Sequence, residues 1–334
     1  MRVFVTGGTG FFGGRLVARL HAAGFEVVAL ARRPDEAAQA MPAGVRVVAG
    51  DVTDQGSLER GMDGCEAVFH AAALVKRWVR DPREFDRVNI EGLGNVLRAA
   101  AAARVRKILY TSSFIALGPT DGVIADEDHD PRPRDFHNDY ERTKWAADRF
   151  ARVKMREGEP LVILYPGVIY GVGKLTAGNL VAQAIRQAIE RTLPGTIGPG
   201  DRRQSFTWVE DVAEGHLLAF YRAGFGSRYI LGGENRTVRE LLALVEKESG
   251  VAAPRRKIPY SVASMVGRLQ RWRAYVTHRE PALTDQEVQI YRHEWAYSSE
   301  RAIRDLEYRI TPLEEGVKRT VAWLRSLSPD GVGR

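Results

Sequence analysis

Two groups of residues in this chain are spaced for chemistry. Tyr140 and Lys144 stand four residues apart in Asn138-Asp-Tyr-Glu-Arg-Thr-Lys144, which places a phenol and an ammonium group one turn apart on one helix face. Near the N-terminus, a short apolar run leads into Thr6-Gly-Gly-Thr-Gly-Phe-Phe-Gly13, a glycine-rich turn that can hold a pyrophosphate. A phosphate-holding turn combined with a Tyr/Lys pair indicates redox chemistry with a nicotinamide dinucleotide.

The Tyr/Lys pair is suited to moving a proton to or from a carbonyl oxygen. A free tyrosine has a pKa of about 10, and a neighbouring cation stabilises the phenolate and lowers that pKa. We expect Lys144 to act in this way on Tyr140, which would be the general acid in reduction and the general base in oxidation. Ser113, at the end of an expected strand, can hydrogen-bond the reacting oxygen, and Ser112 is the fallback. A Tyr-x-x-x-Lys match alone is common by chance, but here it is joined to the serines and the glycine turn.

Three glycines of the turn each have a physical role. Gly7, Gly10 and Gly13 allow a tight turn, a close approach of backbone to pyrophosphate, and close packing of a helix on the strand. Their G-x-x-G-x-x-G spacing differs from the G-x-G-x-x-G fingerprint, although they stand in the same place, between a strand and a helix that begins at Phe12. The residues expected to hold the dinucleotide here are Gly7, Gly10, Phe11, Phe12 and Gly13.

The residues at the end of the second expected strand indicate whether NAD or NADP binds. An acidic residue there would take the ribose 2′-hydroxyl of NAD, but the chain has Arg32 and Arg33. Guanidinium groups form forked, charge-assisted hydrogen bonds with phosphate, so this pair favours NADP(H) over NAD(H); two solvated surface arginines are the alternative. Asp51 and Val52 are placed to meet the adenine edge, unless Asp51 merely ends a strand. Small residues after the fourth strand would let the cofactor pass close to the backbone, namely Ala71, Ala72 and Ala73.

The hydrophobic pattern predicts the elements that position these residues. Apolar runs of strand length alternate with helical stretches, which predicts an α/β fold with a Rossmann-like, doubly wound parallel sheet. Ligands bind such sheets beyond the carboxyl ends of the strands, where each motif above stands. The expected strands are Val3–Thr6, Phe25–Leu30, Val45–Ala49, Ala67–His70, Lys107–Thr111 and Leu161–Tyr165, and the clearest helices are Phe12–Ala23, Phe85–Ala103 and Asn138–Glu157.

A smaller, mostly helical substrate lobe is expected after the alternating half. The alternation of strands and helices ends beyond Gly167. The segment from Trp208, with a strand at Ser227–Leu231, is expected to return to the main sheet. The chain is expected to end in a tail that frays. The expected parts are 1–170 with 203–232 for the NADP-binding domain, 171–202 with 233–327 for the substrate lobe, and 328–334 for the flexible tail.

Composition and charge exclude several classes of protein. With 334 residues, 44% of them apolar and 27% charged, the chain has the make-up of a globular protein. Its one cysteine, Cys65, excludes an internal disulfide; with no leader and no membrane span apparent, we expect a cytoplasmic location. The net charge of +7 is spread out without a nucleic-acid motif. The densest basic run is interpreted as a solvated face in preference to a membrane-surface or anion site; it is Pro254–Pro259, followed by Arg268, Arg271 and Arg273.

Several other residues are of types found in active or metal sites, but the sequence around them does not indicate such a site. His70 and His216 are expected to be hydrogen-bonded histidines of the core. The acidic loop Asp126–Asp130 lacks a helix or strand to arrange its carboxylates, so we predict no metal site there. Four aromatic residues are candidates either for an apolar substrate wall or for packing between the lobes: Trp78, Phe136, Phe206 and Trp208.

The order of these motifs resembles the extended short-chain dehydrogenase/reductase superfamily over nearly the whole chain. Within it, the chain is most similar to dihydroflavonol-4-reductase-like enzymes, 3β-hydroxysteroid dehydrogenases and hopanoid-associated sugar epimerases. The closer likeness rests on Val209–His216, Tyr229–Asn235 and Thr311–Gly316. The wider likeness rests on Thr6–Gly13, Asp51-Val52, Phe69–Ala73, Asn89, Tyr110–Ser113, Tyr140 with Lys144, and Tyr165–Gly171.

The resemblance implies a catalytic triad of Ser113, Tyr140 and Lys144. It also implies that Asn89 completes an active-site network of water or ribose. A homodimer is implied as well, formed through the helices that carry the fourth crossover and the Tyr/Lys pair. The residues implied to line the pocket of the nicotinamide carboxamide are Pro166, Gly167 and Ile169.

Departures from the superfamily pattern narrow the activity. Nucleotide-sugar dehydratases have an Asp-Glu pair where this chain has Ser112-Ser113, so dehydration is disfavoured. Arg32-Arg33 stands where epimerases have an acid for NAD. The sequence therefore predicts NADPH-dependent reduction of a ketone or aldehyde on a small metabolite, or the reverse oxidation of an alcohol. The alternative is an NAD-dependent sugar or nucleotide-sugar epimerase, and the remote alternative is a non-enzymatic NADP-binding sensor.

Overall fold

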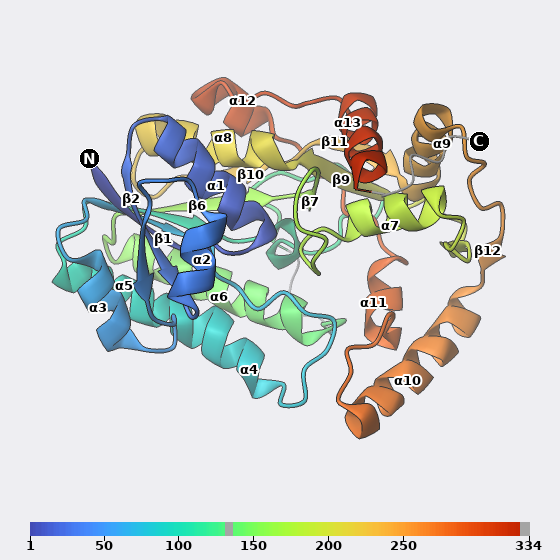
Figure 1. Cartoon of the computed structure of the whole chain (residues 1–334), viewed down its shortest axis with the longest axis horizontal. Coiled ribbons are helices and arrows are strands. Elements are labelled where there is room, and N and C mark those ends of the chain that lie inside the picture. Colours follow the sequence, from blue (N-terminus) through green and yellow to red (C-terminus); the bar gives the residue numbers. More distant parts are fainter. Residues whose placement is uncertain (131–135, 328–334) are drawn as a thin grey trace.

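A seven-stranded parallel sheet lies at the centre of the protein, with helices on both faces (Figure 1). The computed structural model describes residues 1–130 and 136–327, so the tail expected at 328–334 lies outside the described residues. The strands are β1 Arg2–Thr6, β2 Glu26–Ala31, β3 Arg46–Ala49, β4 Ala67–His70, β5 Lys107–Thr111, β6 Leu161–Pro166 and β10 Arg228–Leu231. Their order in space is β10-β6-β5-β4-β1-β2-β3. The predicted fold class and all six expected strands are confirmed.

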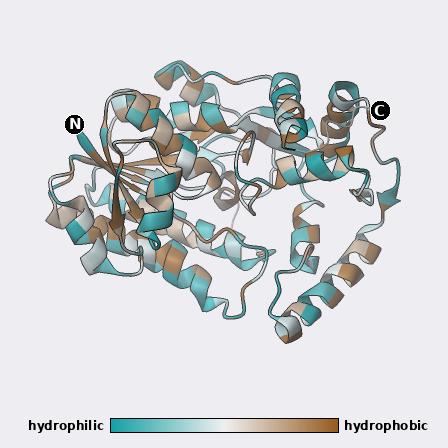
Figure 2. Ribbon diagram, in the orientation of Figure 1, coloured by the Kyte–Doolittle hydropathy of each residue, from teal (hydrophilic) through white to brown (hydrophobic). Residues whose placement is uncertain are grey.

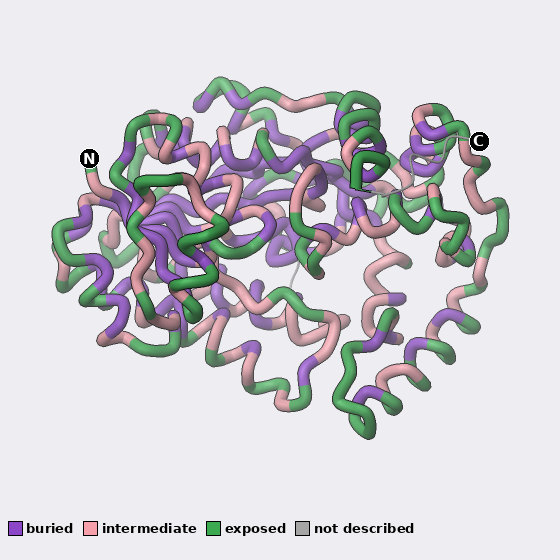
Figure 3. The backbone as a smooth tube through the Cα atoms, in the orientation of Figure 1, coloured by how far each residue is buried: buried purple, intermediate pink, exposed green. Residues whose placement is uncertain are grey.

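Both faces of this sheet are buried, which explains the nearly continuous apolar runs of its strands. In β1, Val3 and Val5 face one core and Phe4 faces the other, as the two-residue period of a strand requires. Figures 2 and 3 show these strands as hydrophobic and buried. Helices α1 (Phe11–Ala22) and α8 (Val209–Arg222) cover the first face, and α3 (Gln55–Met62), α5 (Gly92–Ala102) and α6 (Asp139–Arg156) cover the second.

The direction of strand order reverses between β1 and β4. These two strands are parallel neighbours, and Thr6 at the end of β1 is level with His70 at the end of β4. The glycine turn therefore leaves the sheet beside the run Ala71–Ala73. Open α/β sheets bind ligands in the crevice at such a switch point, so the two predicted cofactor segments lie where a ligand is expected.

Two short sheets lie apart from the main sheet. Strand β9 (Arg203–Trp208) lies between β7 (Val168–Tyr170) and β11 (Glu234–Thr237), while β8 (Thr196–Ile197) pairs with β12 (Lys257–Ile258). Strand β10 joins the main sheet beside β6, as expected. Trp208, in contrast, ends a strand of the separate sheet, because β10 occupies the edge of β6 and β9 pairs with β7 instead. The remaining helices are α2 Pro34–Ala40, α7 Leu180–Ile189, α9 Val238–Ser249, α10 Tyr260–Thr277, α11 Asp285–Ile290, α12 Glu300–Leu306 and α13 Leu313–Ser326.

The helix expected at Phe85–Ala103 is interrupted by a π-helical turn. A short helix, α4 (Arg83–Asp86), runs into the π turn η1 (Arg87–Glu91), and α5 follows directly. Single π turns inside α-helices are frequent at functional sites. This irregularity contains Asn89, one of the predicted site residues.

Candidate active site

Helix α6 carries the Tyr/Lys pair, and its first turn is fixed by an N-cap. The side chain of Asn138 accepts a hydrogen bond of 2.7 Å from the backbone N–H of Glu141, which satisfies a donor that the helix leaves free. This cap sets where the helix begins. Tyr140 and Lys144 then meet the carboxyl end of β5, the strand that precedes the two serines.

The hydroxyl of Ser113 interacts with the phenol of Tyr140 and lowers its pKa in part. Ser113 is buried, and its oxygen also accepts a hydrogen bond of 3.3 Å from the backbone N–H of Ile115. The hydroxyl of Ser112 lies elsewhere, 3.5 Å from the buried carboxylate of Asp148. Of the two candidate serines, Ser113 is therefore the one beside the phenol.

The ammonium group of Lys144 is almost completely buried. It donates a hydrogen bond of 3.0 Å to the carbonyl oxygen of Thr111 and lies 3.5 Å from the hydroxyl of Tyr110. Burial lowers the pKa of Lys144 to about 7, whereas the negative charge of Asp148, one turn further along α6, raises it. The lysine thus titrates near neutral pH.

The pKa of Tyr140 is shifted in the direction opposite to the prediction. Burial raises the pKa to about 12, and the hydrogen bond with Ser113 lowers it only in part. The expected effect of Lys144 is missing because its nitrogen contacts Tyr110 and Thr111. Tyr140 is consequently a neutral phenol at pH 7, which is the form that a proton donor needs.

We expect the kcat/KM of carbonyl reduction to fall as the pH rises through about 7. Lys144 carries its positive charge below its pKa of about 7 and loses it above that pH, while Tyr140, with a pKa of about 12, does not titrate in this range. The Asp148→Asn substitution removes the charge that raises the lysine pKa, so the inflection should move to lower pH. The surface substitution Asp63→Asn should leave it in place. A flat wild-type profile, or an upward move in Asp148→Asn, would contradict this assignment.

Asn89 is buried and bonded to the protein through both atoms of its amide. Its oxygen accepts a hydrogen bond of 2.7 Å from the backbone N–H of Leu74, and its nitrogen donates one of 3.0 Å to the hydroxyl of Thr143. Thr143 directly precedes Lys144. Asn89 therefore ties the loop after β4 to helix α6. The contact with water or ribose that the resemblance implies stays a prediction.

The glycine turn has the shape of a pyrophosphate cradle. Gly7 has a φ of +76°, and the N–H of Gly10 donates a 3.0 Å hydrogen bond to its carbonyl oxygen. A Cβ on Gly7 would lie 2.6 Å from backbone atoms of Ala71 and Ala72, and a Cβ on Gly13 would lie 2.0 Å from the carbonyl oxygen of Gly7. Helix α1 begins directly after the turn, so its free N–H groups and its dipole favour an anion here. The chain therefore fits a dinucleotide at this position.

Arg32 and Arg33 line a cavity of about 590 Å³ beside this turn. Both side chains are largely exposed, and Arg33 forms an ion pair of 3.0 Å with Glu36, a further residue of the cavity wall. The nitrogen Nε of Arg32 lies 3.9 Å from the carboxylate of Asp51. Two guanidinium groups thus stand beside the glycine turn.

Two further cations line the same cavity and were not predicted. Arg15 of α1 donates a hydrogen bond of 2.6 Å to the carbonyl oxygen of Val172, and Lys174 donates one of 2.9 Å to the carbonyl oxygen of Thr9. The loop between β7 and α7 is thereby bonded to the glycine turn. Lys174 and Thr9 are 165 residues apart, and no spacing rule links them, so the sequence carried no signal for this contact.

Asp51 and Val52 are engaged in contacts within the protein. The carboxylate of Asp51 accepts hydrogen bonds from the backbone N–H of Thr53 at 2.9 Å and from its hydroxyl at 2.8 Å. Val52 is buried against α5, where a Cβ on Gly92 would meet its side chain at 3.0 Å. These contacts fix the loop after β3 beside the cavity.

The predicted carboxamide residues lie where the main sheet passes into the smaller one. Pro166 is the last residue of β6, and Ile169 is the middle residue of β7. Gly167 lies between them, and a Cβ there would be 2.4 Å from the hydroxyl of Thr207 in β9. Ala73 continues the loop after β4. These residues mark the side of the site where the two lobes join.

The two histidines of the core have structural hydrogen bonds. The Nδ1 atom of His70 lies 2.7 Å from the hydroxyl of Thr6, and burial lowers the histidine pKa to about 3. The Nε2 atom of His216 lies 2.9 Å from the hydroxyl of Thr111, and burial lowers its pKa to about 4. Phe12 packs against the His216 ring, with the centroids 4.8 Å apart. The ring of Phe12 thus packs in the core, whereas Phe11 lines the cavity. The contact of Phe12 with the dinucleotide stays a prediction.

The acidic loop and the candidate aromatic residues also have contacts within the protein. Asp128 pairs with Arg228 at 2.6 Å and with Arg301 at 2.7 Å, so its charge serves to hold the loop. Phe206 and Trp208 belong to a buried apolar cluster with residues of α7, α9 and α13, which favours packing over a substrate wall. The other two candidates also contact aromatic rings, Phe136 with Trp145 and Trp78 with Tyr275.

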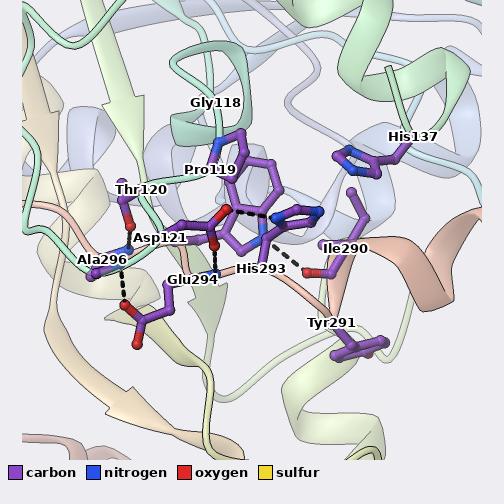
Figure 4. A network of polar contacts seen from close by, with 12 residues as sticks. Gly118, Pro119, Thr120, Asp121, His137, Ile290, Tyr291, His293, Glu294 and Ala296 are labelled. Atoms are coloured by element: carbon purple, nitrogen blue, oxygen red, sulfur yellow. Dashed lines mark hydrogen bonds and ion pairs between the residues drawn. The ribbon is translucent and has the colours of Figure 1, made fainter. Parts of the chain in front are cut away.

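A polar network joins the loop after β5 to the segment that precedes α12 (Figure 4). Asp121 lies 2.7 Å from Nδ1 of His293, and Glu294 forms an ion pair of 2.7 Å with Arg203. The hydrogen bond from Arg203 lowers the pKa of Glu294 to about 2. His137, just before α6, lies close to His293, with ring centroids 4.8 Å apart. The network holds the segment before α12 against the loop after β5 and the start of α6.

The switch-point cradle and the Ser/Tyr/Lys group define an NAD(P)-dependent enzyme that acts on carbonyl or hydroxyl groups. Sequence comparison agrees with this class. The chain belongs to the NAD dependent epimerase/dehydratase family, whose model matches residues 3–232. This confirms the resemblance to the extended short-chain dehydrogenases/reductases.

Several proteins are similar to this chain along its whole length. The 4-hydroxy-2-methyl-3-oxo-4-farnesyl-3,4-dihydroquinoline-1-oxide ketoreductase of Stigmatella aurantiaca is 31% identical, covering 100% of this chain and 98% of the relative. The 2-alkyl-3-oxoalkanoate reductase of Stenotrophomonas maltophilia is 30% identical, covering 96% and 99%. Among solved structures, the UDP-glucose 4-epimerase of Thermus thermophilus in complex with NAD has a TM-score of 0.76 and 27% identity, covering 98% and 100%.

Proposed function

We propose that this protein reduces a ketone on a molecule with a large apolar group, using NADPH. The observation that carries this proposal is the pair Arg32 and Arg33 beside the glycine cradle, since guanidinium groups match a ribose 2′-phosphate. The relatives support the substrate class, because two of them are named for reducing ketones that bear farnesyl or alkyl groups.

Ser113, Tyr140 and Lys144, near the end of β5, would each have a separate role in the reduction. A bound NADPH would supply the hydride that reaches the carbonyl carbon. Tyr140 donates its proton to the carbonyl oxygen as negative charge develops there, and Ser113 donates a hydrogen bond to the same oxygen. Lys144, held at the carbonyl oxygen of Thr111, places its positive charge at the end of β5 when it is protonated. In the reverse direction the phenolate accepts the proton of the alcohol.

The cavity and cradle supply distinct contacts for the parts of the dinucleotide. The turn at Gly7 and Gly13, with the start of α1, would hold the pyrophosphate. Arg32 and Arg33 would hold the 2′-phosphate. Lys174 adds a positive charge from the substrate lobe, and this links cofactor binding to the position of that lobe.

Replacing Arg32 and Arg33 together with serine should weaken NADPH binding by about 10- to 100-fold, because hydrogen bonds to a charged phosphate are lost. NADH binding should change little, since it lacks that phosphate. Titration of both cofactors by fluorescence measures the two affinities. The Arg60→Ser variant, on an exposed surface of α3 outside the cavity, is the matched control. Equal losses for both cofactors, or no loss for NADPH, would refute the proposed specificity.

An NAD-dependent sugar epimerase is the second candidate, favoured by the full-length likeness to the Thermus enzyme. An epimerase returns the hydride to the same molecule and consumes no cofactor overall. Arg32 and Arg33, in place of an acid, support the reductase over this candidate. The phenol of Tyr140, whose pKa Ser113 lowers in part, supports an enzyme over a non-enzymatic sensor.

We also propose a cytoplasmic homodimer. Its subunits would meet through α5 and α6, the helices implied by the resemblance. Sedimentation velocity of the purified chain measures the oligomeric state.

A further inference from the structure

Helix α10 is packed on one face only. Its small residues Ala263, Gly267 and Ala274 are buried, and a Cβ on Gly267 would lie 2.4 Å from the backbone nitrogen of Asp285 at the start of α11. In Figure 1 the helix lies at the edge of the molecule, beside α11 and far from the main sheet. Figure 3 shows buried and exposed residues alternating along it, as expected for a helix with one packed face. The opposite face of α10 is therefore exposed at the protein surface.

That opposite face is apolar. Five large side chains recur at intervals of three and four residues, so they fall on one side of the helix. Their exposed fractions reach 65% at Leu269 and 66% at Trp272, and Figure 2 shows hydrophobic residues distributed along the helix. A contiguous exposed stripe of this kind marks an interaction site. We name it the apolar stripe; it consists of Val262, Met265, Leu269, Trp272 and Val276.

The segment around the apolar stripe has basic residues but no acidic ones. Residues 250–279 contain no Asp or Glu. Arg268 and Arg271 share one acid of α11, Asp285, at 4.0 and 3.0 Å. The segment has seven lysine and arginine residues: Arg255, Arg256, Lys257, Arg268, Arg271, Arg273 and Arg279. Apart from Arg268 and Arg271, these residues form no ion pair within the described part of the chain.

We propose that α10 docks the protein on an anionic lipid bilayer, with the apolar stripe inserted between headgroups and the basic residues paired with lipid phosphates. An amphipathic helix with basic residues and Trp or Leu on its apolar face lies in the plane of a membrane interface. The docking is peripheral, because no helix among the described residues is long and apolar enough to cross a bilayer. This differs from the solvated face that the sequence predicts, since the arginine spacing does not show which side of the helix is packed.

A second copy of the chain fits the apolar stripe less well. The intervals of three and four residues also suit a partner helix. However, the residues flanking the stripe are Arg268 on one side and Arg273 on the other, with no acid in the segment to face them. Two copies would bring like charges together, whereas anionic headgroups neutralise them.

A chain of contacts connects α10 to the active site. Tyr275 near the end of α10 packs edge-on against Trp78, with ring centroids 5.3 Å apart. Trp78 lies in the loop after β4, and in the same loop Leu74 donates its N–H to Asn89. Arg77, between them, pairs with Glu287 of α11 at 3.1 Å. Docking through α10 would therefore place this wall of the site near the bilayer, from which an apolar ketone can enter.

Co-sedimentation of the full-length protein with lipid vesicles tests the proposal. Binding to phosphatidylcholine vesicles that contain phosphatidylglycerol should be at least about tenfold tighter than to pure phosphatidylcholine, and should weaken as salt is added. The Leu269→Ser/Trp272→Ser double variant should lose at least about tenfold in binding. The matched control, Tyr221→Ser/Phe225→Ser, removes two exposed aromatic side chains outside α10 and should bind like the wild type. NADPH affinity should be equal in all three proteins, because both pairs lie outside the cofactor cavity.

Three results would overturn the proposal. The first is equal binding of the wild type to anionic and neutral vesicles, and the second is undiminished binding by the Leu269→Ser/Trp272→Ser variant. The third is a wild-type dimer that this variant converts into a monomer in sedimentation velocity, which would make the stripe a subunit interface. None of these results depends on whether the enzyme is a reductase or an epimerase.

Discussion

Replacing Tyr140 with phenylalanine should lower kcat by about 10²- to 10⁴-fold, the range that a positioned general acid contributes. The variant keeps the ring and loses only the hydroxyl that interacts with Ser113, so the proposed proton donor to the carbonyl oxygen is removed. NADPH affinity should stay nearly unchanged, because the cradle and Arg32/Arg33 hold the cofactor. Steady-state kinetics with a reducible ketone and a fluorescence titration of NADPH measure the two quantities.

The matched control for this prediction is Tyr221→Phe, which removes the hydroxyl of an exposed tyrosine. It should leave kcat and cofactor affinity unchanged. Near-normal turnover by Tyr140→Phe would show that another group supplies the proton. A parallel loss of NADPH affinity would show instead that the phenol serves mainly to hold the cofactor.

Replacing Gly13 with alanine should have the second large effect. The new Cβ would lie 2.0 Å from the carbonyl oxygen of Gly7 and 2.7 Å from its carbonyl carbon, and both are backbone atoms that cannot rotate away. The turn must shift, and a displacement of binding groups by about 1 Å can cost about 10²-fold. We expect about a 100-fold loss of NADPH affinity, together with an overpacking cost of about 1–3 kcal/mol in the free energy of unfolding. Titration and thermal unfolding measure these changes.

Gly14→Ala provides an adjacent comparison. A Cβ on Gly14 would lie 3.6 Å from the carbonyl oxygen of Gly8, an ordinary contact. Alanine also favours a helix over glycine by about 0.8–1.0 kcal/mol, so stability should be equal or higher. Because Gly14 also lines the cavity, NADPH affinity should fall, but by much less than in Gly13→Ala. Similar behaviour of the two variants would mean that the close approach at Gly13 is unimportant.

The parts of the site that follow local rules could be predicted from the sequence. The glycine turn stands at a strand end, and the carboxyl ends of parallel strands meet at one edge, so the cradle and Ser113 were expected near one another. The four-residue interval placed Tyr140 and Lys144 on one helix face. Strand positions were predictable because a sheet buried on both faces needs continuous apolar runs.

Other features depend on contacts between distant segments. Lys174 reaches Thr9 only because the loop after β7 folds back over the cradle. The pKa shift predicted for Tyr140 had the wrong sign, since a shared helix face does not show that Lys144 turns its nitrogen toward Thr111. The pairing of β9 with β7 likewise depends on distant segments, because β10 occupies the edge of β6.

The measurement that tests the central claim most directly is the fate of NADPH in a screen of ketones. Purified protein is mixed with NADPH and ketones that carry apolar groups, and the absorbance of the reduced cofactor is followed while the nucleotide released on denaturation is identified. Our account predicts NADPH consumption equal to the alcohol formed, with no NAD retained by the purified protein. Tightly held NAD, together with no ketone-dependent loss of NADPH, would contradict it.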